Sequence, residues 1–158
     1  MTSCRFGWLY ALALRPRAAL LACAFFLAIT NDVVAGTAII GRVTITEGDV
    51  FIITDGVSTR AKPGSTVKAA DTLITGSGGS MGIVLRDDTR ISLGPTSAML
   101  MKEVEFDPLH DKNLFVARLN KGSMLYESHW DGKVASVETP HATIGIRGTR
   151  FLLRVEDE

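Results

Sequence analysis

Cysteine is nearly absent from the sequence. The 158 residues include two cysteines, Cys4 and Cys23, and both lie within the first 35 residues. Residues 36–158 therefore contain no disulfide, no thiolate metal site and no cysteine nucleophile. A chain without cross-links must be held together by its own core, and the roughly 120 residues from Gly36 onward are enough for one ordinary domain.

An excess of charge of either sign is also missing. The chain has 17 Lys and Arg against 17 Asp and Glu. The first 35 residues hold three Arg and one Asp, which leaves 14 basic against 16 acidic residues, a net charge of −2. The basic residues are scattered singly and form no stripe, so we expect no nucleic-acid partner.

The sequence has no apolar run long enough to span a bilayer. Its longest, Ala18–Ile29, has about a dozen residues, against the ~20 that a spanning helix needs. Arg5, Arg15 and Arg17 precede it, and Val33 and Ala35 place small residues at −3 and −1 before Gly36. This pattern predicts a signal peptide over residues 1–35 and a periplasmic or secreted domain over 36–158. The alternative is an uncleaved inner-membrane anchor, which would be the domain's one contact with the membrane.

Catalytic patterns are missing as well. His110, His129 and His141 stand alone, with no HxH, HxxxH or HExxH spacing. No serine lies in a GxSxG elbow, and Gly76-Ser77-Gly78-Gly79 lacks the Lys-Ser/Thr of a phosphate loop. We therefore expect a non-enzymatic protein with no catalytic residue, no metal and no cofactor.

What the sequence does contain is turn-forming residues at regular intervals. Signals such as Asp55-Gly56, Gly94-Pro95 and Lys121-Gly122 recur about every ten residues, between β-branched and alternating runs. The pattern predicts a single all-β domain of about ten short strands, arranged as a roll, a solenoid-like stack or a sandwich. The phenylalanines expected in its core are Phe51, Phe106, Phe115 and Phe151.

The stretch 137–155 has the clearest alternation. Ile144 and Ile146 mark one strand, Phe151 and Leu153 mark a second, and Gly148 breaks the pattern between them. Glycine at such a break favours a positive φ. Thr139-Pro140 is expected at the start of the first strand. The pattern predicts that this stretch is the structural centre and that Phe151 is buried, with a cost of roughly 3–5 kcal/mol on truncation.

Arg147 interrupts the apolar pattern of that stretch. We expect its guanidinium to satisfy turn carbonyls or to pair with Glu138 or Asp88. A second reading, in which Arg147 holds an anionic ligand, stays open.

Three motifs in order carry a resemblance to a known family. They are Thr139-Pro140 with Ile146-Arg147-Gly148-Thr149 and Phe151; Thr75-Gly76 with the run Met81–Leu93 and Pro95; and Leu119–Gly122. Together they resemble the signature of the FecR family over about Gly41–Val155. Asp88 stands where the family usually has glycine.

The resemblance implies an all-β envelope domain that works through contacts with other proteins. In FecR-type regulators this module follows a cytoplasmic anti-sigma region and one membrane helix, and it passes a signal from an outer-membrane receptor. Only about 17 residues precede the apolar segment here, so we expect a stand-alone exported module, or a truncated regulator, without the anti-sigma activity.

The implied function is a protein-interaction or sensory module in envelope signalling, with an envelope protein as partner. The alternative is a glycan-binding or peptidoglycan-binding module that uses the edge formed by Tyr126 and Trp130. The motif residues that serve as structural or interface positions are Thr75, Gly76, Leu93, Pro95, Thr139, Pro140, Arg147, Gly148, Thr149 and Phe151.

Overall fold

The structure is a computed structural model, and it describes residues 38–107, 112–129 and 134–156. The chain divides after Ala35 into two units, and the described residues belong to the second, 36–158. The predicted signal segment, His110 and Trp130 lie outside the described residues. No helix long and apolar enough to cross a membrane occurs in the described ranges.

The regular structure of the described residues consists of strands, as the turn spacing predicts. There are twelve: β1 (Ile39–Glu47), β2 (Val50–Thr54), β3 (Val57–Arg60), β4 (Thr66–Lys68), β5 (Thr72–Thr75), β6 (Ser80–Leu85), β7 (Arg90–Leu93), β8 (Ala98–Asp107), β9 (Lys112–Glu127), β10 (Val134–Glu138), β11 (Thr143–Ile146) and β12 (Arg150–Val155). The all-β prediction is confirmed.

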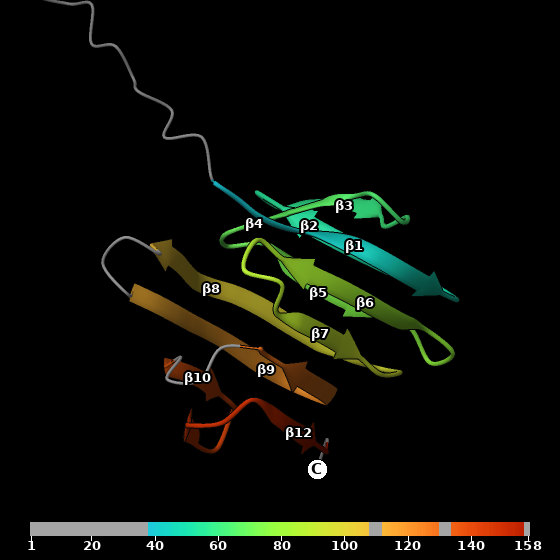
Figure 1. The fold of residues 1–158 in the computed structure, drawn as a ribbon. Helices are drawn as coiled ribbons and strands as arrows, with labels where there is room; N and C mark the ends of the chain where they lie inside the picture. The colour runs from blue at the N-terminus through green and yellow to red at the C-terminus, as the bar shows by residue number, and fades with distance from the viewer. Residues whose placement is uncertain (1–37, 108–111, 130–133, 157–158) are drawn as a thin grey trace, which may run out of the picture. The chain divides into compact units, whose positions relative to one another are not determined.

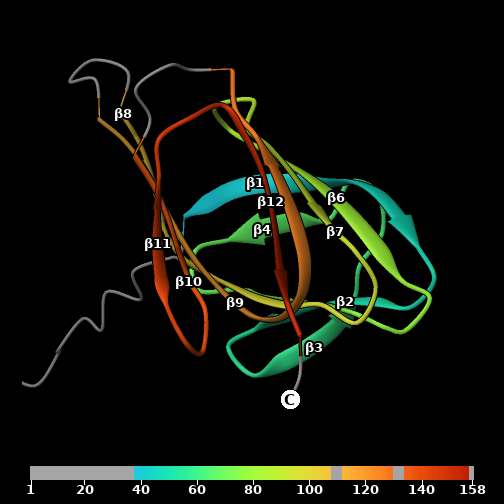
Figure 2. The ribbon, with the colours of Figure 1, turned by 90° about the horizontal axis from the view of Figure 1, so that it is seen from below.

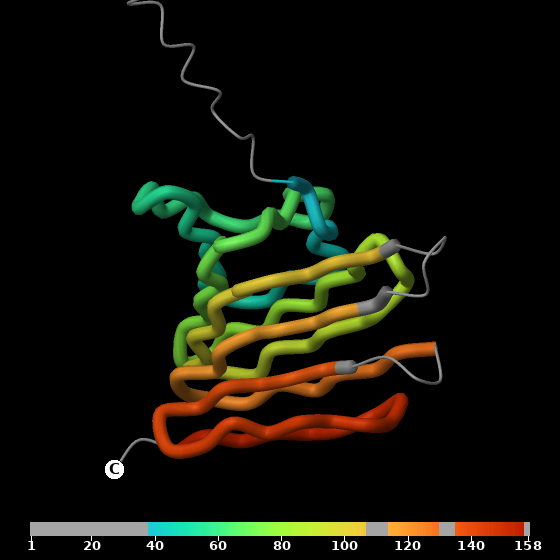
Figure 3. The backbone as a smooth tube through the Cα atoms, turned by 90° about the vertical axis from the view of Figure 1, so that its left-hand side faces the viewer, coloured from blue at the N-terminus to red at the C-terminus, as the bar shows by residue number. Residues whose placement is uncertain are grey.

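The strands form one sheet that curls into two facing layers. Its order is β3-β2-β5-β8-β9-β7-β6-β1-β4. The first layer contains β3, β2, β5, β8 and the first half of β9, and β10 and β11 extend it. The second layer contains β4, β1, β6, β7 and the second half of β9, and β12 extends it. The chain thus winds from the β1–β4 end to the β11–β12 end of a stack (Figures 1 and 3).

Strand β9 joins the two layers, which the sequence did not suggest. It runs unbroken through Lys121-Gly122, where a turn between two strands was predicted. Up to Lys121 it pairs with β8, and from Gly122 to Glu127 it pairs with β12. Gly122 has a φ of +87°, so the strand changes layer at the one residue type that adopts this conformation without steric cost.

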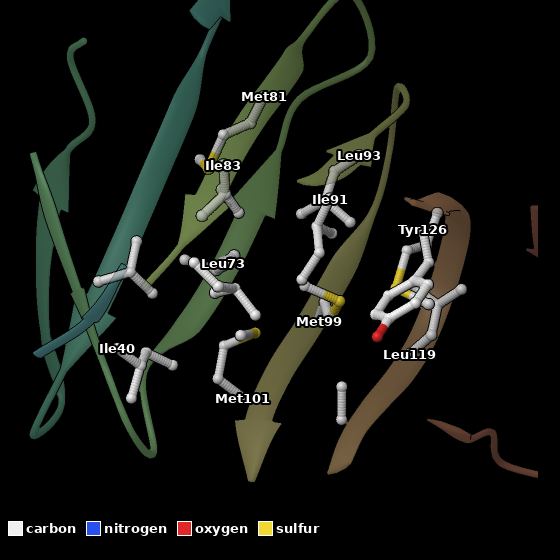
Figure 4. Close-up of a cluster of buried hydrophobic side chains, with 14 of the residues drawn as sticks. Ile40, Leu73, Met81, Ile83, Ile91, Leu93, Met99, Met101, Leu119 and Tyr126 are labelled. Carbon is white, nitrogen blue, oxygen red and sulfur yellow. The ribbon is translucent and has the colours of Figure 1, made fainter. Parts of the chain in front are cut away.

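The core lies between the layers and follows the alternation of the strands. In β6 and β7 every second residue faces inward, because side chains in a strand point to opposite faces. Figure 4 shows Met81, Ile83, Leu73, Met99 and Leu93 meeting in one cluster. Burial of each such side chain stabilises the fold by about 1.5–3 kcal/mol.

The four phenylalanines that were predicted to fill the core differ in burial. Phe115 is fully buried, whereas Phe51, Phe106 and Phe151 are half-buried. The prediction that all four fill the core is therefore correct for Phe115 and only partly correct for the other three.

The stretch 137–155 is an end of the stack and not its centre. Residues in β11 and β12 alternate between half-buried and exposed, and none of them is fully buried. Seen from that end, β11 and β12 are the last strands of the two layers (Figure 2). The predicted strands and the break between them are confirmed. Their central position is wrong, because no further strand of the described chain covers them.

Candidate interaction site at the C-terminal end of the stack

The turn between β10 and β11 is built around the Thr139 hydroxyl. Thr139 Oγ1 accepts a hydrogen bond from the Ala142 amide at 3.0 Å and donates one to the Ala142 carbonyl at 3.1 Å. The Thr139 amide also donates to that carbonyl at 2.7 Å. Pro140 therefore lies inside a tight turn and not at a strand start as predicted. Its fixed φ and missing N–H suit the turn equally well.

The segment Arg147-Gly148-Thr149 carries the chain from one layer to the other. It leaves β11, which pairs with β10, and enters β12, which pairs with β9. Gly148 has a φ of +157° and lies between the end of β11 and the start of β12, where the sequence predicts a break. The Thr149 carbonyl accepts a hydrogen bond from the Ser128 amide at 2.7 Å. This corner is held by backbone contacts, and the side chains of Arg147 and Thr149 are exposed.

Glu138 is the partner of other cations and not of Arg147. Its carboxylate accepts hydrogen bonds from Lys102 Nζ at 2.8 Å and from Arg118 Nε and Nη2 at 2.9 and 2.7 Å. The hydrogen bond from Lys102, followed by those from Arg118, lowers the pKa of Glu138 below its usual value. The predicted pairing of Arg147 with Glu138 or Asp88 is not present. The Arg147 guanidinium donates no hydrogen bond to any described residue.

Strand β12 packs one face on the core and leaves the other in solvent. Phe151 stacks on Tyr126 with ring centroids 4.8 Å apart. On the exposed face, Leu152 is 73% accessible, and Arg150 Nε pairs with Glu127 Oε1 at 3.0 Å. The end of the stack thus presents a half-covered apolar row beside exposed arginines.

Tyr126 is a core residue and not an edge residue. It is fully buried between Phe115 and Phe151, with centroid distances of 5.2 and 4.8 Å. Burial raises the pKa of Tyr126. Interactions with the Ser128 and Thr89 side chains oppose this rise, although neither gives the hydroxyl a hydrogen bond of good geometry. The one described residue of the proposed sugar-binding edge is therefore inaccessible to a ligand.

The upstream motif residues form a separate, structural site. Thr75 Oγ1 donates to the Gly94 carbonyl at 2.6 Å and accepts from the Ser97 amide at 2.8 Å. The Gly76 amide donates to the Asp49 backbone carbonyl at 2.8 Å. Leu93 is buried, and Pro95 lies exposed in the adjoining turn between β7 and β8. The hydrogen bonds of Thr75 and Gly76 hold neighbouring turns in place. None of these motif residues lies on β11 or β12.

Sequence reasoning missed the residue that completes this site. Ser97 is fully buried, and its hydroxyl accepts from the Ser123 amide at 3.0 Å and donates to the Gly94 carbonyl at 2.8 Å. It thereby links the β7–β8 turn to the bend of β9. A serine two residues after Pro95 and a glycine in the Leu119–Gly122 motif were visible in the sequence, but nothing in their spacing showed that they meet.

The described residues offer no cluster of side chains that could bind a metal ion. They contain no group of three or more His, Asp or Glu side chains that would hold an ion. His129 and His141 are exposed. Two open grooves of about 560 and 550 Å³ lie over β1, β6 and β7 of the second layer, and both are lined by Val84 and Asp88.

Comparison with known proteins defines the class of this two-layered domain. The model of the FecR protein family matches residues 71–158, which include every motif residue named above. The chain therefore belongs to the FecR family, which is known in envelope signalling. Comparisons with curated proteins and with solved structures found no match.

Proposed function

We propose that this protein is a non-catalytic interaction module of the periplasm that engages an envelope protein through β11, β12 and the corner between them. The observation that carries the proposal is the exposure of the downstream motif. Pro140, Arg147, Gly148 and Thr149 are exposed, so their side chains fill no part of the core and are available for contact with another molecule. Exposed side chains on a rigid frame are suited to recognition.

The open edges of β11 and β12 supply the mode of binding. A strand at the edge of a sheet presents unpaired N–H and C=O groups, and an extended segment of a partner adds to it by main-chain hydrogen bonds. Leu152 and Arg147 are the side chains that would give such binding its specificity. This role accords with a signalling family and requires no chemistry.

The experiment is a pull-down from envelope extracts with the tagged protein recovered from the envelope fraction. The paired variants are Arg147→Ala and Leu152→Ser at the proposed site, with Lys62→Ala, at an exposed residue between β3 and β4, as the control. A specific protein that is captured by the wild type and the control, and lost with both site variants, supports the proposal. Capture that is equal for all four forms would place the contact elsewhere.

A cell-wall polymer is the second candidate ligand. The paired grooves favour it, because their linings carry Arg42, Arg86 and Arg90 against a single carboxylate, Asp88. Retention of the wild type on isolated cell wall, and its loss on Arg42→Ala with Arg90→Ala, would support this alternative and not the protein-binding role.

A further inference from the structure

Two strand edges are unpaired at one end of the stack. Among the described strands, β11 pairs with β10 and with no other, and β12 pairs with β9 and with no other. Both edges lie at the end that Figure 2 shows in front. An exposed edge of this kind is a template for another strand, which is why soluble proteins cover it or charge it.

The side chains of β12 remain incompletely covered. Phe151, Leu153 and Val155 pack against the core but are only half-buried. A further strand beside β12 would cover them, because side chains directly opposite in an antiparallel pair lie about 4.5–5.5 Å apart. The unpaired main-chain groups of β12 and its half-buried apolar side chains would therefore both be satisfied by the same ligand. That ligand is an extended segment with small or apolar side chains on its inner face.

The sequence of β12 is complementary to itself in one register. If two copies of β12 pair antiparallel about Leu153, Arg150 of one faces Glu156 of the other, Phe151 faces Val155, and Leu153 faces its own counterpart. Inner residues then meet inner residues, and the charged pair joins opposite signs on the outer face. Centring the pair on Leu152 instead would place Arg150 opposite Arg154, which is destabilising.

The charges of the neighbouring strand favour the same register. Arg150 already pairs with Glu127 on β9 at 3.0 Å, and Glu156 is exposed. In the Leu153-centred pairing Arg150 would lie between Glu127 of its own chain and Glu156 of the second copy. The Arg150–Glu156 pair would occur twice in the dimer, because a two-fold interface uses the same surface on both copies.

We propose that two copies of this chain associate end to end through antiparallel pairing of β12 about Leu153. This inference goes beyond the proposed function, because it assigns a second copy of the chain to the same open end as an alternative to the envelope protein. A two-fold axis normal to the layers would also bring the free edges of the two β11 strands together and cover Ile144 and Ile146. The pair would form a continuous two-layered body with no open edge at its middle.

The first test measures molar mass by light scattering after size exclusion, on protein expressed from the full chain and recovered from the envelope fraction. The concentrations run from about 1 to about 100 µM, which covers dissociation constants of weak to moderate complexes. The wild type is expected as a dimer at the upper end. Glu156→Arg and Arg150→Glu are each expected to weaken association at least tenfold, while Lys62→Glu, a reversal of charge at an exposed residue between β3 and β4, leaves it unchanged.

A mixing experiment separates lost pairing from damaged folding. One variant carries two positive charges at positions 150 and 156, and the other carries two negative ones. Mixing Glu156→Arg with Arg150→Glu should therefore restore a dimer of one chain of each kind. Restoration supports the proposal, and two monomeric variants that stay monomeric when mixed would overturn the charge pairing.

Cross-linking tests the register. Leu153→Cys is expected to form a disulfide-linked dimer under mild oxidation, because each Leu153 faces its counterpart. Leu152→Cys, one residue away on the exposed face, should not rise above the parent chain's background. Cross-linking of Leu152→Cys and not of Leu153→Cys would overturn the Leu153 register.

The outcomes also separate this inference from the proposed function. A wild type that stays monomeric up to about 100 µM overturns the self-association. If that monomer still captures an envelope protein in a manner that depends on Arg147 and Leu152, the open end binds a different partner and the proposed function stands. A dimer that captures nothing would support the self-association and reject the envelope partner.

Discussion

The side chain of Ser97 occupies the space that a side chain on Gly122 would need. A Cβ built on Gly122 would lie 2.7 Å from the Ser97 Cβ and closer still to its hydroxyl. This contact joins the β7–β8 turn to the bend at which β9 changes layer, so it couples two motifs that lie about 25 residues apart in the chain.

Gly122→Ala is expected to destabilise the domain by about 2–5 kcal/mol. The strain of a positive φ contributes about 1–2 kcal/mol and the overlap with Ser97 a further 1–3 kcal/mol. Urea unfolding followed by far-ultraviolet circular dichroism measures it. Gly145→Ala is the control, because its Cβ would meet nothing within 4 Å. Equal midpoints for the two variants would show that the bend tolerates a side chain.

Phe151→Ala is expected to cost about 2 kcal/mol, less than the 3–5 kcal/mol of a fully buried aromatic residue. The reduction follows from its half-buried position on the end of the stack, where it keeps one stacked contact with Tyr126. The exposed Lys62→Ala should change the free energy of unfolding by less than about 0.5 kcal/mol. A loss above about 4 kcal/mol would mean that the end is covered in solution.

Asp88→Gly is expected to stabilise the domain by about 0.5–1 kcal/mol. Asp88 has a φ of +61°, a conformation that glycine adopts without steric cost and other residues with strain. Asp88→Ala keeps the strain and loses the polar side chain, so it should not stabilise. The two variants are compared by thermal unfolding, and a lower melting temperature for Asp88→Gly would show that the carboxylate contributes more than the strain costs.

Glu138 gives the domain a pH dependence with a defined sign. Its folded pKa lies below the unfolded one, so its contribution is present above the unfolded pKa and is lost as pH falls through the folded pKa. The difference in stability between wild type and Glu138→Gln should therefore be largest near neutral pH and shrink in acid. The exposed Glu105→Gln is the control, and a difference that grows on acidification would contradict the assignment.

Cleavage after Ala35 remains a prediction from the sequence. Amino-terminal sequencing of the protein from the envelope fraction should begin at Gly36. The same sample should contain no titratable thiol, because both cysteines precede that point. An intact Met1 in the membrane fraction would establish the anchored alternative.

The sequence predicted strand content and alternation well because these depend on neighbouring residues. Ile144 with Ile146 and Phe151 with Leu153 lie on inner faces as their spacing indicates. It did not predict which strands are neighbours. Alternation reports that a residue faces a core, but not how many layers cover it, and so it could not distinguish the end of a stack from its centre.

The site shows the same limit. The break at Gly148 follows from residue type and was predicted, whereas the partner of Glu138 depends on long-range pairing. Arg118 faces Glu138 because β9 and β10 run parallel, a relationship that leaves no trace in the spacing of the two residues. The burial of Tyr126 likewise follows from the bend of β9 and not from its own neighbours.

The position of β9 between neighbours on both of its edges has a consequence for how the domain opens. Amide protons of β9 can exchange with solvent only when the strands on either side separate, so they should report the opening of the whole domain. Strands β11 and β12 each depend on a single neighbour and can fray without disturbing the rest. The end of the stack can therefore open locally, at a free-energy cost set by the pairing of one strand and not by the stability of the entire protein.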